Sequence, residues 1–122
     1  MTRTLEGDVL VHHLTQDERI IDAELLAKHG RSGRTLVKEG PLRLTMMALA
    51  AGGVLPAHSA SGHVTIHVLE GAVTFNAINQ DYALASGDVL VIAPNVMHSA
   101  RSTSGSVFLL TVIFLGEKES QK

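Results

Sequence analysis

The chain has 122 residues, of which 45% are hydrophobic and 18% charged, with a formal net charge of −2 at pH 7. This length suits one domain, and the apolar content is enough for a packed core, so neither a second domain nor a disordered chain is expected. An acidic balance with 3% aromatic residues argues against a nucleic-acid partner, which needs basic stripes and exposed rings. The absence of cysteine excludes disulfides, thiolate metal ligands and a thiol nucleophile.

The N-terminal region is expected to form an arm and one helix. It begins with charged residues where a signal peptide needs an apolar run, and no stretch approaches the ~20 apolar residues that span a bilayer. We therefore expect a cytoplasmic protein with no membrane partner. Thr15 and Glu18 have the spacing of a capping box, and Gly30 supplies a left-handed stop, so the spacing predicts a helix over residues 16–29.

Beyond Gly33, short runs of Val, Leu, Ile and Thr alternate with turn signals at a spacing typical of a sandwich or barrel. Strands are predicted at 34–38, 42–49, 54–58, 63–69, 72–77, 81–85, 89–93, 97–101 and 106–115. No helix-length apolar period separates them, which disfavours a parallel sheet with crossover helices. The predicted organisation is an N-terminal arm and helix (1–33), an all-β domain (34–116) and a polar tail (117–122).

Two segments together resemble the paired motifs of the cupin superfamily. The first family motif reads glycine, five residues, His, one residue, His, three or four residues, Glu, six residues, glycine. Here Gly52 and His58 match, Ala60 stands in the place of the second His, Val64 in the place of the Glu, and Gly71 closes the motif. The spacing is kept, but two ligand positions of the family carry apolar residues.

The second family motif reads glycine, five residues, Pro, one residue, glycine, two residues, His, three residues, Asn. Gly87 and His98 match it, and Pro94 lies one place from the family's proline. Asn95 replaces the turn glycine and tolerates the same left-handed geometry, while Ser102 replaces the final Asn. Both motifs in order on an all-β chain are more specific than either alone.

The resemblance covers residues 42–115 and implies an all-β cupin-type double-stranded β-helix, an RmlC-like jelly-roll barrel, with a short N-terminal helix. In relatives with complete motifs, three histidines and a glutamate hold a divalent metal inside the barrel. Only His58 and His98 remain of that set here. Catalytic metals usually have about three protein ligands, so two imidazoles would hold iron, manganese, nickel or zinc only weakly.

A third ligand is sought among the other histidines. Strand alternation that turns Val64 inward turns His63 and His67 outward, where surface or dimer-contact roles are expected. His63 becomes a metal ligand only if a bulge at residues 61–62 turns it inward. The remaining histidines, all in the N-terminal region, are expected to be exposed: His12, His13 and His29.

The pocket is expected to have a soft apolar wall suited to small organic ligands, although ordinary core packing explains the same residues. Its expected lining residues are Thr45, Met46, Met47, Ala60, Val64, Phe75, Met97 and Phe108.

Several functions are open at this stage, and no catalytic residue is assigned. The leading hypothesis is a small-molecule-binding cupin with a pocket centred on His58 and His98 and a weak metal site at most. The alternatives are a metal-dependent enzyme of oxygenase or isomerase type using both histidines, metal-free acid–base catalysis by them, and a dimeric sensing or interaction module. A homodimer is expected in every case, since a small barrel leaves sheet edges for a second copy to cover.

Overall fold

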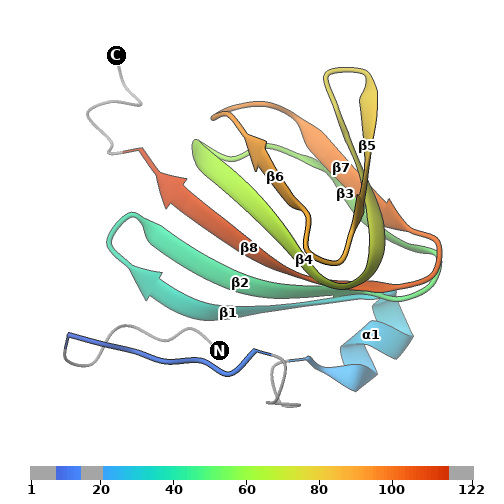
Figure 1. Cartoon of the computed structure of the whole chain (residues 1–122), viewed down its shortest axis with the longest axis horizontal. Coiled ribbons are helices and arrows are strands. Elements are labelled where there is room, and N and C mark those ends of the chain that lie inside the picture. The colour runs from blue at the N-terminus through green and yellow to red at the C-terminus, as the bar shows by residue number, and fades with distance from the viewer. Residues whose placement is uncertain (1–7, 15–20, 116–122) are drawn as a thin grey trace.

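The structure is a computed structural model that describes residues 8–14 and 21–115. Its elements are the helix α1 (Ala23–His29) and the strands β1 (Arg31–Glu39), β2 (Leu42–Leu49), β3 (Gly53–His58), β4 (Gly62–Ala77), β5 (Gln80–Ala85), β6 (Val89–Ile92), β7 (His98–Ser102) and β8 (Ser106–Phe114). The strands curl into a barrel-like antiparallel sheet, and α1 lies at one end of it (Figure 1). This confirms the predicted all-β barrel with a short N-terminal helix.

The long strand β4 makes the sheet curl. The strand order is β1-β2-β8-β4-β7-β3, and β5 and β6 also pair with β4. The first half of β4 pairs with β8 and β6, and its second half pairs with β5 and β7. Between the halves, Gly71 has a φ of 73°, and a Cβ there would meet the carbonyl oxygen of Gly105. Only glycine suits this bend, which explains the residue that closes the first motif.

The helix prediction is correct at its end and wrong at its start. Gly30 ends α1 in the left-handed region, with a φ of 76°. The helix begins only at Ala23, because Asp22 is extended and its carboxylate accepts hydrogen bonds from the backbone amides of Glu24 and Leu25. The predicted capping box at Thr15 lies outside the described residues. None of the helices within residues 8–14 and 21–115 is long and apolar enough to cross a membrane.

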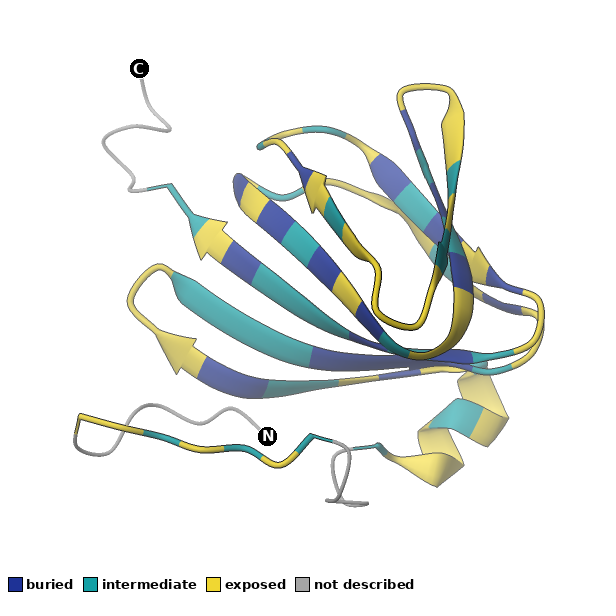
Figure 2. Cartoon of the chain, viewed as in Figure 1, coloured by how far each residue is buried: buried dark blue, intermediate teal, exposed yellow. Residues whose placement is uncertain are grey.

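Side chains alternate between two apolar clusters on opposite faces of the sheet. Along β4, Val64, Ile66 and Val68 are buried while His63 and His67 are exposed, as the alternating colours of that strand show (Figure 2). The inner cluster of buried residues consists of Met47, Leu49, Val64, Ile66, Val68, Val73, Phe75, Ile92, Ala100, Phe108 and Val112. The outer cluster consists of Leu36, Val37 and Met46, with Leu10, Leu14, Ile21, Leu42, Leu44, Leu69, Val107 and Leu109 packed against it. Strands β2 and β8 therefore bury side chains on both faces.

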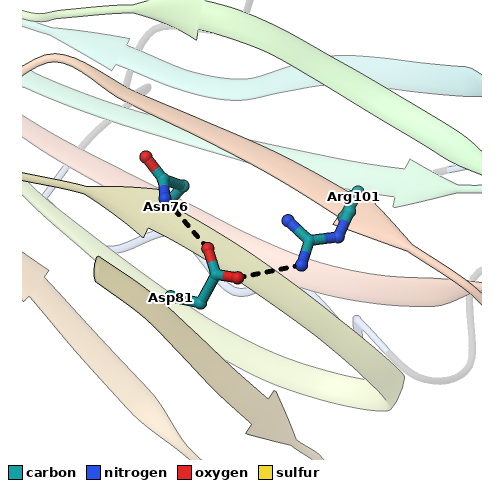
Figure 3. Close-up of polar contacts among 3 residues, drawn as sticks. All are labelled: Asn76, Asp81 and Arg101. Carbon is teal, nitrogen blue, oxygen red and sulfur yellow. Dashed lines mark hydrogen bonds and ion pairs between the residues drawn. The ribbon is translucent and has the colours of Figure 1, made fainter. Parts of the chain in front are cut away.

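A polar contact on the exposed side of β4 and β7 holds the β5 hairpin (Figure 3). Asp81 accepts a hydrogen bond from the Asn76 side chain at 2.9 Å and forms an ion pair with Arg101 at 3.0 Å. The hydrogen bond from Asn76 makes the largest contribution to lowering the pKa of the Asp81 carboxyl, and the hydrogen bond from Arg101 makes the next largest. All three side chains reach solvent, so this contact orients the hairpin more than it stabilises the fold.

Candidate functional site

His58 and His98 are brought together by the pairing of β3 with β7. The register of this pair shifts between Leu55 and His58, so the strand bulges there. Pro56 lies within the bulge, where no backbone N–H is needed for pairing between the strands, so a proline fits there. Beyond the bulge, His58 is paired with His98, and the ring centroids are 4.4 Å apart with planes inclined by 61°.

Both imidazoles are oriented by the backbone in the same way. The Nδ1 of His58 lies 2.8 Å from the carbonyl oxygen of Pro56, and the Nδ1 of His98 lies 2.9 Å from that of Val96. A carbonyl oxygen only accepts, so each Nδ1 carries the proton. In the neutral ring the Nε2 atom is then unprotonated, and the pair presents two nitrogens that accept hydrogen bonds or bind a cation.

The two histidines differ in their exposure to solvent. His98 is 3% exposed, while His58 is an exposed residue. Burial has the largest influence on His98 and lowers its pKa. The hydrogen bond to the Val96 carbonyl raises the pKa, and the charge of His58 lowers it further. His98 is therefore neutral at neutral pH, since its ordinary pKa is already about 6.5.

Phe75, a residue of the inner cluster, lies beside the buried ring. Phe75 lies 6.4 Å from the His98 ring, measured between centroids, and 5.7 Å from Phe108. Val64, Phe75 and Phe108 belong to the inner cluster, and Ala60 packs against it. The amide of Asn95 donates to the Ala60 carbonyl at 2.8 Å, and Asn95 adopts the expected left-handed geometry with a φ of 65°. The turn before His98 is thus attached to the loop after His58.

Of the other residues singled out by the sequence, Met46 and His63 lie on the outer face of the sheet, away from this pair. Met46 belongs to the outer cluster, because its neighbour Met47 takes the inward position on β2. Met97 is 59% exposed. His63 is exposed on the outer face and paired with Ile113, and the register of β4 with β8 is unbroken from Gly62 to Val68, without the bulge that would turn His63 inward.

The expectation that His12 is exposed is wrong. Its side chain is partly buried, and its Nε2 atom is buried without a hydrogen-bond partner among the described residues. His13 and His29 are exposed as expected. Leu10, His12 and Leu14 recur at every second position, and this alternation was the available signal that the arm lays one side against the sheet.

The family can now be stated from the comparison of sequences. The sequence model described as "Cupin domain" matches residues 45–114. The chain belongs to the cupin family. A search of curated proteins gives no match.

Solved structures share the fold of this cupin. An RmlC-like cupin protein from Desulfovibrio desulfuricans is 23% identical with a TM-score of 0.72, over 87% of this chain and 97% of that one. The conserved SPY1581 protein of unknown function from Streptococcus pyogenes is 22% identical with a TM-score of 0.70, over 92% and 91%. A salicylate 1,2-dioxygenase from Pseudaminobacter salicylatoxidans is 19% identical with a TM-score of 0.67, over 74% of this chain and 30% of that one. At these identities the likeness concerns the fold alone.

The residues present do not fit a tightly bound metal of the kind the family often carries. Within residues 8–14 and 21–115, no three His, Cys, Asp or Glu side chains are grouped to hold an ion. Ala60 and Val64 offer no donor atoms at the two remaining motif positions. The donor set is therefore a pair of imidazoles, which is short of the three protein ligands of catalytic metal sites.

Proposed function

We propose that this cupin binds a small molecule at a pocket centred on His58 and His98. The observation that supports it best is the contact of the two rings at 4.4 Å, with each Nδ1 held by a backbone carbonyl. This arrangement commits both Nδ1 atoms to the protein and leaves both Nε2 atoms for a ligand. A binding role accounts for two oriented imidazoles better than a purely structural one does, because a structural pair needs no free acceptors.

The ligand that suits this pair carries hydrogen-bond donors on a small apolar body. The Nε2 atoms of His98 and His58 offer two acceptors when the rings are neutral, and the buried Phe75 beside His98 makes the interior behind them apolar. Adjacent hydroxyl groups on one molecule would satisfy both Nε2 atoms at once. A divalent cation would bind the same two nitrogens weakly, with water completing its coordination.

Elemental analysis of the purified protein tests the metal side of this proposal. We expect less than stoichiometric iron, manganese, nickel or zinc after dialysis. Added Zn²⁺ should bind weakly and shift the imidazole proton signals of His58 and His98 in NMR spectra. His58→Ala and His98→Ala should abolish these shifts, whereas His63→Ala and His67→Ala on the outer face should keep them.

A panel of small vicinal diols and their methyl ethers tests the ligand side. Diols should perturb the same two imidazoles, and the ethers should bind at least about tenfold more weakly because they lack the donors. Equal binding of diols and ethers would contradict the proposal. A stoichiometric metal that survives dialysis and is lost in His58→Ala would favour the metal-dependent enzyme of oxygenase or isomerase type instead.

Metal-free acid–base catalysis is a second candidate, supported by the lowered pKa of His98. A neutral imidazole accepts a proton from a bound substrate at neutral pH, provided that its Nε2 atom lies within hydrogen-bond reach. Such an activity would survive a chelator and disappear in both His58→Ala and His98→Ala. An activity lost on chelation would exclude it.

We also propose that the chain forms a homodimer through the outer face of β4, β6 and β8. Val89, Val91 and Ile113 are exposed there, beside the outward-facing His63 and His67. A second copy covering this face would bury these apolar side chains. Light scattering of the wild type should give twice the mass of the chain, and Val91→Lys should give the mass of a monomer. A monomeric wild type at micromolar concentration would refute the proposal.

A further inference from the structure

We propose a second ligand site at the seam between β1 and β3, beside α1, which takes a small molecule with an apolar body and one carboxylate. These two strands are the ends of the strand order, and they do not pair with each other among the described residues. A cleft of about 410 Å³ lies at this seam, within the ~300–1,000 Å³ range of small-molecule sites. Its lining includes Leu25 and His29 of α1, Arg31 and Gly33 of β1, Met47 of β2 and Leu55 of β3.

The Arg31 side chain reaches across the seam. In β1 it stands opposite Leu49 of β2, a residue of the inner cluster, so it lies on the inner face of the sheet. Its Nη1 atom donates to the backbone carbonyl of Val54 in β3 at 3.3 Å. Since Leu55, the next residue, lines the cleft together with Arg31, this hydrogen bond holds the guanidinium beside the cleft. The cation is therefore positioned before a ligand arrives.

The turn that carries Arg31 is itself attached to the sheet. Gly30 accepts a hydrogen bond from the Ala50 amide at 2.9 Å, and its φ of 76° ends α1 just before Arg31. A Cβ at Gly53, at the start of β3, would meet the Gly30 carbonyl oxygen, so the two backbones are in close contact. The end of α1 and the start of β1 are thus held against β3 at this end of the cleft.

No negative charge balances Arg31 within the described part of the chain. No carboxylate there forms an ion pair with it, and none of the described lining residues is acidic. A guanidinium has five N–H donors, of which the Val54 carbonyl takes one. The exposed His29 adds a ring N–H to the same end of the cleft. A carboxylate accepts two parallel bonds from a guanidinium and is the group that suits this end.

The polar and apolar parts of the lining lie at different distances from the turn. His29 and Arg31 flank Gly30 directly. Leu25 lies one helical turn before His29 on the same face of α1, and Gly33 lies two residues beyond Arg31 on the same face of β1. A ligand whose carboxylate meets Arg31 therefore extends its body toward Leu25 and Gly33.

The cleft has an apolar floor where Gly33 leaves room. Gly33 stands opposite Met47, and a Cβ on it would lie 2.8 Å from the Met47 sulfur, so the missing side chain opens the cleft onto the thioether. Met47 belongs to the inner cluster, and Leu55 packs against that cluster. Leu25, on the opposite wall, is 41% exposed. An apolar body placed here removes these surfaces from water, which a bare anion such as acetate does not do.

The test compares 3-phenylpropanoate with 3-phenylpropanamide, which share one body and differ in charge. Each is titrated into the full chain with ¹³C-labelled methionine and leucine methyl groups. Both should shift the Met47 methyl signal but not that of Met46 on the outer face. The carboxylate should bind about tenfold more tightly at low ionic strength and lose most of this advantage in ~0.5 M NaCl, because salt screens an exposed cation. The imidazole signals of His58 and His98 should not move, so the result is independent of the function proposed for the barrel.

Two variants separate the roles of the cation and the floor. Arg31→Gln should bring the affinity ratio of the two probes close to one. The matched control Arg34→Gln removes the same charge from the same strand, but opposite Met46 on the outer face, and should keep the ratio. Gly33→Val should weaken the binding of both probes by filling the floor.

The wild-type titrations decide the matter even if a variant fails to fold. Equal affinities of the two probes at low salt, shifts at Met46 or His98 in place of Met47, or no binding up to the solubility limit would each overturn the proposal. An equal loss of the ratio in Arg34→Gln and Arg31→Gln would also overturn it, because the effect would then come from the net charge of the chain.

Discussion

The inner and outer apolar clusters share strands β2 and β8, yet the histidine beside each cluster differs in whether a ring nitrogen has a hydrogen-bond partner among the described residues. In the barrel, the Nδ1 atom of His98 has the Val96 carbonyl as its partner, and the ring packs beside His58 and Phe75. Under the N-terminal arm (residues 8–14), the Nε2 atom of His12 is buried with no partner among the described residues, and the His12 residue lines a cavity. A buried imidazole is stable in a close-packed core when the backbone nearby supplies an acceptor.

The two clusters also differ in how they are enclosed. The inner cluster is walled by paired strands on both halves of the curled sheet, and Ile66, Val68 and Phe108 are fully buried in it. The outer cluster is covered by an arm that pairs with no strand within the described residues. Strand pairing fixes the distance between opposing walls, while a single extended segment leaves room, so we expect the outer cluster to be the less stable of the two.

Truncation of one residue in each cluster should give the largest difference. Ile66→Ala removes a side chain with 0% exposure and should lower the free energy of unfolding by about 3 to 5 kcal/mol. Leu36→Ala should cost about 2 kcal/mol, because the side chain already borders a cavity and loses fewer contacts. Urea denaturation measures both values. Equal losses would mean that the clusters are packed to the same degree and would remove the distinction drawn above.

Replacing each buried imidazole with phenylalanine should give effects of opposite sign. His12→Phe removes a polar atom that has no partner among the described residues and should leave stability unchanged or raise it by about 1 kcal/mol. His98→Phe removes a hydrogen bond and crowds Phe75, so it should lower stability by about 1 to 3 kcal/mol. Denaturation near pH 8, where His98 is neutral, gives both numbers. A destabilised His12→Phe would show that this nitrogen has a partner in solution.

The sequence predicted the structure best for strands that bury one face against the inner cluster. The strand pattern predicted β2 with its observed bounds, 42–49. The resemblance of the glycine and histidine spacings to the paired cupin motifs predicted that His58 and His98 share one pocket. With Val64 taken as inward from its motif position, parity placed His63 outward.

Features that depend on contacts with other parts of the fold could not be predicted from the sequence. Alternation states that Met46 and Met47 face opposite ways, but not that both faces of β2 are covered. The turn between the predicted strands 72–77 and 81–85 lies at Ile78 and Asn79, with φ values of 51° and 59°, and this left-handed conformation is one that a β-branched residue such as Ile78 does not signal. The helix begins at Ala23 rather than at the predicted residue 16, because Asp22 caps its first turn. Each miss reflects a tertiary or capping preference that periodicity does not encode.

Acidification should weaken the inner cluster through His98. Its pKa in the folded state lies below the ordinary value of about 6.5, so the unfolded chain binds the proton more readily. The stabilising contribution is complete above pH ~6.5 and is lost as the pH falls from there through the lowered folded pKa. We expect wild-type stability to fall as the pH is lowered from about 6.5 through the lowered folded pKa, and the fall to be smaller in His98→Gln. Parallel profiles for the two proteins would exclude His98 as the cause.

The smallest effect is expected outside both clusters, at the ion pair of Asp81 with Arg101 (Figure 3). Because the pKa of Asp81 is lowered, its contribution is present above its ordinary value and is lost only as the pH falls through the lowered one, far below the range in which His98 titrates. Asp81→Asn should therefore change Tm at neutral pH less than Ile66→Ala, Leu36→Ala or His98→Phe does, since solvent screens an exposed pair. Thermal unfolding followed by circular dichroism measures this. A loss as large as that of Ile66→Ala would mean that the attachment of the β5 hairpin to β7, rather than the two apolar clusters, limits the stability of the barrel.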